Sequence, residues 1–418
     1  MREKKMGMRA VLTRLLGIAT VACALVATPA VAKAETQVMP DGVKAEVLSL
    51  TQDGTKSVQI TEPGSYVLKT AEGEVTPKSG YTIDAPNASR INPVRIYIDG
   101  TVYVNDSTTA SLSQERWLFN IKQGSNIEFI GVNNPCVSFH RNQKQFESVS
   151  GFLTDRYYSG GYKKASGDIS VSLEVGDGSK DFVLSYGDKY EQKVPAISLG
   201  SAEGELAAKF EKLKIQGYVG KSGAVAGNTQ EYAVPVHLFR EGRDTDGGNT
   251  NPFTATFTDC AFYDTSGDFN GAVSVDGNSS FKMPKDGSDG SAAAKLTATF
   301  NNCSFSGYNG NGAEVRQTNK SYTSVEASRY FANSSYLNTF AVAGVMGVTN
   351  ATVNLNDCTM DNFHSTRSSS ADNTLTVDAL NVARSARCNI NGGKISRYGA
   401  RGNTCVVYAA GTLTLSGS

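Results

Sequence analysis

The sequence predicts an all-β chain built as a solenoid of parallel strands, and two observations support this prediction. The first is a nine-residue phrase whose copies begin at Phe210, Phe257, Phe300, Leu355 and Ile390. Each copy has a large apolar residue at its first position and small or apolar residues at its fourth and sixth positions. These positions do not share one helical face with the aromatic that closes most copies. They fit two short strands separated by a bend.

The second observation is a further apolar segment between successive copies of the phrase. Such alternation, with variable loops, is typical of a solenoid whose coils each supply strands to parallel sheets. A right-handed path is expected because parallel crossovers are right-handed. The intervening segments are Val234–Phe239, Ala272–Val275, Phe340–Val342, Leu375–Val377 and Cys405–Val407.

The first 34 residues have the pattern of a secretory signal peptide. A basic start precedes an apolar run from Leu15 to Ala27, and Ala32-Lys33-Ala34 fits the small-x-small cleavage rule. We predict cleavage before Glu35, with cleavage after Ala32 as the alternative. An uncleaved membrane anchor is disfavoured because the run is short for a span. No second apolar run follows, so no transmembrane segment is expected after cleavage.

Composition argues against nucleic acid as a partner. Removal of residues 1–34 leaves 34 basic and 39 acidic side chains, a net charge of −5, whereas nucleic-acid-binding domains are usually basic.

Six cysteines remain in this mature chain. Cys260, Cys303 and Cys358 occupy the fourth position of the phrase, where other copies have Leu213 and Gly393. A position shared by Cys, Leu and Gly indicates an interior packing position and not half of a disulfide.

The remaining chain divides into four predicted regions. Residues 35–80 contain short strand patterns and are expected to cap the first coil, whose edge and apolar end need cover. Residues 81–140 alternate apolar and polar positions and are expected to form the first coils. Residues 206–418 hold the repeats. Because Leu415 starts a sixth copy that stops at once, the repeats are expected to continue beyond Ser418.

The fourth region, residues 141–205, breaks the rhythm and is predicted to be an inserted β subdomain. Ile169–Val175 and Phe182–Tyr186 flank Gly176-Asp177-Gly178, a typical hairpin signal. Tyrosines cluster here, which suits either a small aromatic core or a ligand-facing arm. They are Tyr157, Tyr158, Tyr162, Tyr186 and Tyr190.

The phrase from Phe300 to Tyr308, with its relatives, resembles the coils of right-handed parallel β-helix proteins in the pectate-lyase-like superfamily. The resemblance covers roughly residues 80–140 and 206–418. That superfamily includes polysaccharide lyases, glycosidases and secreted or surface adhesins, so the fold does not choose among these functions. The Asn-Thr-Asp, Asp-Asp, Gly-His-Gly and Arg-Ile-Lys motifs of its polygalacturonase-like members do not occur here.

An alignment of the intervening segments gives the catalytic candidates. If Val275, Val342, Val377 and Val407 point inward, the residues that follow them form one outward column: Asp276, Ala343, Asp378 and Tyr408. Two carboxylates with one rung between them would lie roughly 9–10 Å apart, at the upper edge of the spacing in inverting glycosidases. Asp276 and Asp378 are therefore the catalytic candidates and Tyr408 a binding candidate. The alternative is a pair of solvated carboxylates on a sheet face.

A second group of polar residues crowds the end of the first intervening segment. His237, Arg240 and Arg243 are candidates for ligand binding, with a solvated polar loop as the alternative. Asp244-x-Asp246-Gly247 matches half of a calcium loop, but the later acidic ligands are missing. No cofactor is therefore expected, and calcium is the one ion with any support.

We therefore expect a secreted or cell-surface protein, adhesin-like or glycan-binding, whose partner is a polysaccharide or a cell-surface glycan. The alternative is a carbohydrate-active enzyme, either a polysaccharide lyase or an inverting glycosidase. An enzyme needs a groove in which charged groups converge, whereas a binding protein can use aromatic platforms or polar ladders.

Overall fold

The chain divides into two units, Met1–Glu35 and Thr36–Ser418, and every strand described below lies in the second. The computed structural model describes residues 35–50, 57–71, 74–77, 79–106, 116–124, 126–141, 147–148, 150–158, 162–186, 191–192, 194–220, 234–240, 251–265, 272–277, 295–307, 341–342, 346–349, 351–361, 364–365, 375–382, 386–396, 399–400, 404–409 and 411–417.

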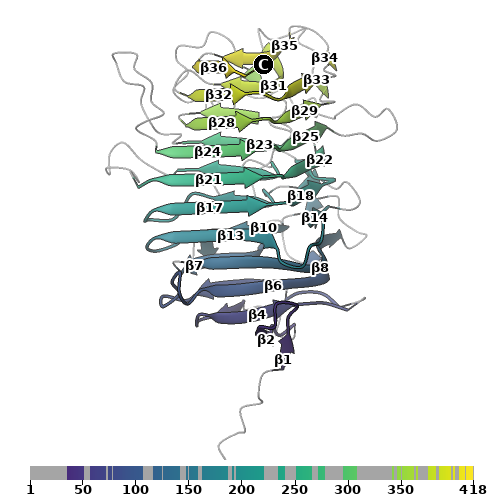
Figure 1. The fold of residues 1–418 in the computed structure, drawn as a ribbon, viewed down its shortest axis with the longest axis vertical. Coiled ribbons are helices and arrows are strands. Elements are labelled where there is room, and N and C mark those ends of the chain that lie inside the picture. Colours follow the sequence, from purple (N-terminus) through teal and green to yellow (C-terminus); the bar gives the residue numbers. More distant parts are fainter. Residues whose placement is uncertain are drawn as a thin grey trace, which may run out of the picture. The chain divides into compact units, whose positions relative to one another are not determined.

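Two long sheets form the body of the second unit (Figure 1). Across the described residues, the larger sheet has 18 strands: β1 (Thr36–Val38), β2 (Lys44–Val47), β4 (Gly64–Leu68), β6 (Val94–Asp106), β8 (Ile127–Arg141), β13 (Ile169–Val175), β14 (Phe182–Ser185), β17 (Leu206–Glu211), β18 (Leu213–Gln216), β21 (Phe253–Thr258), β22 (Ala261–Thr265), β24 (Leu296–Asn301), β25 (Ser304–Gly307), β28 (Thr352–Asn356), β29 (Thr359–Asp361), β32 (Arg387–Asn391), β33 (Lys394–Ser396) and β36 (Thr412–Ser416).

The second sheet has 11 strands among the residues described: β3 (Val58–Ile60), β5 (Tyr81–Asp84), β7 (Arg116–Gln123), β10 (Ser150–Thr154), β16 (Ile197–Leu199), β20 (Val236–Phe239), β23 (Val273–Asp276), β26 (Ala341–Val342), β27 (Met346–Thr349), β31 (Leu375–Val382) and β35 (Thr404–Ala409). Smaller sheets join β9 (Glu147–Ser148), β15 (Glu191–Gln192) and β19 (Val219–Gly220); β11 (Arg156–Tyr158) and β12 (Tyr162–Lys164); and β30 (His364–Ser365) and β34 (Gly399–Ala400).

The strands of both long sheets follow one another in chain order as rungs, and their pairings are parallel except between β1 and β2. Figure 1 shows this succession from β4 through β13 and β21 to β36. The predicted all-β parallel β-helix solenoid is therefore confirmed.

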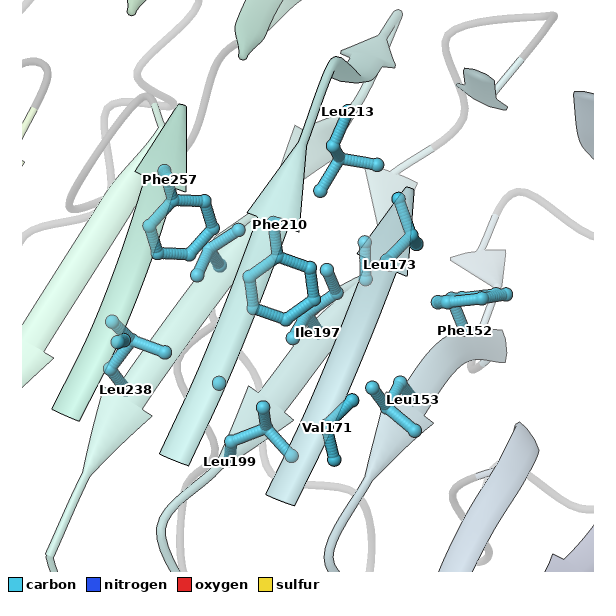
Figure 2. Close-up of a cluster of buried hydrophobic side chains, with 14 of the residues drawn as sticks. Phe152, Leu153, Val171, Leu173, Ile197, Leu199, Phe210, Leu213, Leu238 and Phe257 are labelled. Carbon is cyan, nitrogen blue, oxygen red and sulfur yellow. The ribbon is translucent and has the colours of Figure 1, made fainter. Parts of the chain in front are cut away.

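The register confirms the repeated phrase. Phe210 pairs with Phe257, Phe257 with Phe300, Phe300 with Leu355, and Leu355 with Ile390. The rings of Phe210 and Phe257 are parallel with centroids 4.8 Å apart, and those of Phe257 and Phe300 are 4.7 Å apart. Figure 2 shows Phe210 and Phe257 directed toward Leu199 and Leu238 of the opposite sheet. The first position of the phrase is thus a continuous core column between the two sheets.

The bend of the phrase is a column of left-handed residues. The third position has a φ of 53° at Lys212, 54° at Asp259, 51° at Asn302 and 52° at Asp357, and Gly392 follows at 70°. Each backbone N–H in this column donates to the carbonyl one rung further along, as from Asp259 to Asn301. Asn and Asp tolerate this conformation better than other non-glycine residues, which explains their recurrence at this position.

The three phrase cysteines are buried and unbridged, as predicted. Each thiol donates to a main-chain carbonyl of the preceding rung: Cys260 to Phe210 at 3.3 Å, Cys303 to Phe257 at 3.5 Å, and Cys358 to Phe300 at 3.3 Å. They therefore act as small core side chains with a weak donor.

The N-terminal residues cover the outer face of the first rungs. β2 runs parallel to β4 and antiparallel to β1. Met39 and Ala45 pack with Val67, Tyr97 and Ile130 in a cluster separate from the main core. The coils begin at β3 and β4, because these strands already pair with β5 and β6.

The expected hairpin of Ile169–Val175 with Phe182–Tyr186 is not formed. β13 pairs in parallel with β8 and β17, while β14 pairs with β8 and β18, so neither strand pairs with the other. Gly178 does have a φ of +79°. A solenoid bend and a hairpin turn both favour a glycine with positive φ. The sequence Gly176-Asp177-Gly178 therefore does not distinguish the two structures. The hairpin in this region is instead β11–β12, a local excursion.

Of the five clustered tyrosines, the structure describes the side chain of Tyr186 alone. Tyr186 is core: its ring stacks on Phe139 with centroids 4.4 Å apart and meets Tyr218 edge-on at 5.0 Å. The side chains of Tyr157, Tyr158 and Tyr162, and the whole of Tyr190, lie outside the described residues.

Candidate functional site

The register of the smaller sheet does not place Asp276 and Asp378 in one column. Asp276 pairs with Thr349 of β27 and not with Ala343. Asp378 lies where the pairing of β31 with β35 shifts, between Val377 and Leu380. The expected alignment was wrong because the segment at Phe340–Val342 and β27 belong to one interrupted strand. The carboxylate pair that supported an inverting glycosidase is therefore not formed as predicted.

The same register places two other candidates in one column but far apart. His237 pairs with Ser274, Ser274 with Gly347, Gly347 with Asn381, and Asn381 with Tyr408. His237 and Tyr408 thus occupy one column, four strand spacings or about 19 Å apart.

His237 is buried within this column. Its ring stacks on that of Phe239 with centroids 4.7 Å apart. Its pKa is lowered to about 3, first by burial and second by the positive charge of Arg156. A neutral, buried imidazole stacked on an aromatic ring is suited to packing and not to contact with a ligand from solvent.

Arg240 is also buried, and its guanidinium is committed to the main chain. Nη1 donates to the carbonyl of Ala202 at 2.9 Å, and Nη2 donates to those of Gly204 at 3.1 Å and Pro252 at 2.7 Å. Its Cζ lies 5.4 Å from the ring centroid of Phe253. Arg240 therefore fastens the connections of two successive coils. Arg243, the third binding candidate, lies outside the described residues, as do Asp244 and Asp246 of the calcium half-motif.

Asp155 completes this buried group and was not predicted from the sequence. Its carboxylate accepts from the backbone N–H of Gly200 at 3.0 Å and from that of Ala202 at 2.7 Å. Burial raises the pKa of Asp155, and the hydrogen bonds from the backbone of Ala202, Ser201 and Gly200 oppose this shift. The available signal was an acidic residue two positions after the apolar pair Phe152-Leu153.

We call Asp155, Arg156 and Arg240 the charged clamp. Arg156 Nε donates to Ser201 Oγ at 2.7 Å, and its Cζ lies 5.0 Å from the ring centroid of Phe239. The chain from Gly200 to Gly204 is therefore held at three kinds of group. The Asp155 carboxylate accepts from its backbone N–H groups, Arg156 donates to the Ser201 hydroxyl, and Arg240 donates to its carbonyls. This arrangement stabilises the turn and leaves no buried carboxylate without donors.

An accessible polar surface lies on the larger sheet, opposite the phenylalanine column. Outward positions of five successive strands hold hydroxyl and amide side chains in three columns, broken by a single arginine. We call this surface the Thr/Asn face. It consists of Thr254, Thr256 and Thr258 of β21; Thr297, Thr299 and Asn301 of β24; Thr352, Asn354 and Asn356 of β28; Arg387, Asn389 and Asn391 of β32; and Thr412, Thr414 and Ser416 of β36.

Hydrogen bonds along the columns order this face. Asn389 Nδ2 donates to Asn354 Oδ1 at 2.8 Å, and Asn354 Nδ2 donates to Thr299 Oγ1 at 3.2 Å. In the neighbouring column, Asn356 Nδ2 donates to Asn301 Oδ1 at 2.8 Å. The donor always lies on the later coil. These side chains are partly buried by their neighbours yet reach solvent, so the ladder presents fixed polar groups at rung spacing.

Among the described residues, no three His, Cys, Asp or Glu side chains gather as ligands for a metal ion. Nor does the described part of the chain include a helix with the length and hydropathy needed to cross a bilayer.

No protein-family model matches this chain, and no match was found among curated proteins or among solved structures.

Proposed function

We propose that this protein is a secreted or cell-surface β-helix protein that binds a glycan through the Thr/Asn face. The observation that supports this proposal best is the hydrogen-bonded ladder of Asn354, Asn389 and Thr299 within an accessible, regular array. Sugar hydroxyls both donate and accept hydrogen bonds, and so do Thr, Ser and Asn side chains.

Preorganisation strengthens the argument. Immobilising a free polar side chain on binding costs roughly 0.5–1.5 kcal/mol. In the Thr/Asn face, Asn354 is already held from both sides, by Asn389 as donor and by Thr299 as acceptor. Folding has therefore already immobilised these side chains, so less free energy is lost when a ligand binds. Weak contacts along several rungs can then add up to measurable affinity.

Binding is favoured over catalysis. The inverting-glycosidase alternative placed Asp276 and Asp378 in one outward column with one rung between them, whereas Asp276 pairs with Thr349 and Asp378 lies at a register shift. Five of the described polar residues of the smaller sheet are buried: Thr82, Thr154, Ser198, His237 and Ser274. Membership of the pectate-lyase-like superfamily, adhesin-like type, remains part of this proposal and is supported by the parallel coils.

Export is the second part of the proposal, and it is supported by the sequence of residues 1–34. The boundary between the two units, after Glu35, lies one residue beyond the predicted cleavage site.

Glycan arrays probed with the mature chain from Glu35 onward test the binding proposal. Asn354→Ala combined with Asn356→Ala is expected to weaken binding about tenfold or more, because each lost hydrogen bond contributes roughly 0.5–1.5 kcal/mol. Ser172→Ala is the matched control, since Ser172 occupies the same outward column as Asn354 but three strands before β24. Failure to retain any glycan, or equal loss in the control, would contradict the proposal.

A further inference from the structure

Three successive strands of the Thr/Asn face, β21, β24 and β28, have no charged side chain at their outward positions. β21, β24 and β28 contribute nine outward residues to it, all Thr or Asn. The first charged residues in the same three columns are Lys209 and Glu211 on β17 and Arg387 on β32. Within the three columns, the strands β21, β24 and β28 therefore offer no cation that would compensate a negative charge.

The hydrogen-bonding capacity of the face is balanced between donors and acceptors. An Asn amide has two N–H groups and an oxygen with two lone pairs. Asn354 uses one N–H toward Thr299 and one lone pair toward Asn389, so one N–H and one lone pair remain for a ligand. Threonine hydroxyls also donate and accept. The array fits ligand groups that do both.

Two carboxylates lie in the bend column that borders the face. Asp259 and Asp357 are exposed there, two rungs apart, with Asn302 between them. Asn302 Nδ2 donates to Asp259 Oδ1 at 2.6 Å, which orients that carboxylate but leaves its charge. Lys212 is the one cation of this column among the described residues. A polyanion lying on β24 and β28 would thus be bordered by like charge.

We infer that the ligand class is a neutral polyhydroxylated polymer and not a carboxylated or sulfated one. Carboxylates and sulfates only accept hydrogen bonds, so they would leave outward Asn oxygens facing negative charge without donors, at a cost in binding free energy. This inference rests on the proposed glycan binding by the Thr/Asn face and adds the charge class of the ligand.

The test uses the mature chain with two sets of immobilised probes, the neutral polymers xylan and mannan and the polyanions polygalacturonate, alginate and heparin, at low and high salt. We expect a neutral polymer to be retained equally at both salt concentrations, because its binding involves no charge pairs to be screened. Asn356→Asp, which adds a charge without a change in size, is expected to reduce this retention several-fold.

The outcomes separate the inference from the function on which it rests. Salt-sensitive retention of a polyanion that Asn354→Ala with Asn356→Ala abolishes would overturn the inference and leave glycan binding by this face intact. Retention of neither class would overturn both. Circular dichroism and the Tm of each variant show that the altered retention is not a loss of fold.

Discussion

At the scale of single residues, buried polar groups in this protein are stabilised by the main chain. Asp155 takes N–H donors from Gly200 and Ala202, and Arg240 donates to three carbonyls. The sequence predicted that Arg240 matters but assigned it to a ligand. A charged residue at a strand end looks the same in sequence whether its partner is a ligand or a carbonyl of the next coil. Only the fold decides between these.

The buried histidine predicts a loss of stability in acid. The folded-state pKa of His237 is about 3, below its ordinary value of 6.5. The folded state thus favours the neutral ring, and the stabilisation is complete above pH 6.5 and is lost as the pH falls from 6.5 toward 3. The contribution of His237 to the free energy of unfolding therefore changes by up to roughly 1.4 kcal/mol per pH unit in this range. Urea unfolding of the wild type and His237→Gln at several pH values measures it.

Between pH 6.5 and 3, the free energy of unfolding of His237→Gln should depend less steeply on pH than that of the wild type. The raised pKa of Asp155 acts in the opposite sense, because its contribution declines as the pH rises through the folded-state value. Parallel curves for wild type and His237→Gln would show that the ring is not kept neutral by folding.

The thiol column predicts chemical inertness. Cys303 has its pKa raised to about 12, first by its interaction with Cys260, with a further contribution from burial. Cys358 and Cys388 are shifted in the same direction. Since only the thiolate reacts quickly, Cys303 and Cys358 should resist iodoacetamide in the native state and react fully in denaturant. Cys260 should behave in the same way because its side chain is buried.

Peptide mass mapping of the alkylated protein distinguishes these states. Mapped disulfides among the three thiols, or their rapid native labelling, would contradict the column.

At the scale of elements, the sequence predicted the larger sheet better than the smaller one. The phrase holds strand, bend and strand within nine contiguous residues, so its spacing fixes the register, and Phe300 meets Leu355 as expected. In the smaller sheet, long variable loops separate the strands. Val275 pairs with Val348 and not with Val342, because alternating apolar residues fit several registers equally and nothing local marks the right one.

The close approach of successive coils predicts a difference between two glycines. Gly393 has a φ of +88°, and an added Cβ would lie 2.2 Å from the carbonyl oxygen of Cys358. Gly42 has a φ of +83° and nothing within 4 Å of the same position. Left-handed backbone costs a non-glycine residue roughly 1–2 kcal/mol. Gly42→Ala should cost about this much, and Gly393→Ala clearly more, in denaturant unfolding. Equal losses would mean that the bends are not closely stacked.

The core column predicts a second contrast, between adjacent residues of β24. Phe300 is fully buried between Phe257 and Leu355, whereas Asn301 points outward. Phe300→Ala should lower the free energy of unfolding by roughly 3–5 kcal/mol. Asn301→Ala loses one ladder hydrogen bond, from Asn356, and should cost about 1 kcal/mol. Similar midpoints for the two variants in a urea titration would refute the inward–outward assignment.

At the scale of the whole second unit, the two halves of the core are joined differently. Around β7, β8 and β10, Phe119, Phe129 and Phe152 meet at tilted angles with centroids 4.9–5.7 Å apart. From β17 onward, phenylalanines instead stack face to face along the rungs. The first arrangement links several elements at once, whereas the second links each coil mainly to its two neighbours.

This difference predicts how far the destabilisation caused by a core substitution extends along the solenoid. In a solenoid, each repeat is stabilised mainly by its neighbours, so Phe300→Ala should raise hydrogen exchange in β21, β24 and β28. The strands β4, β6 and β8 should keep wild-type protection, because β24 has no direct pairing with them. Hydrogen-exchange mass spectrometry under native conditions resolves these peptides. Phe129→Ala serves as the comparison, and its effect should reach both sheets around β7, β8 and β10. A uniform rise in exchange along the whole chain in Phe300→Ala would show that the coils unfold as a single cooperative unit.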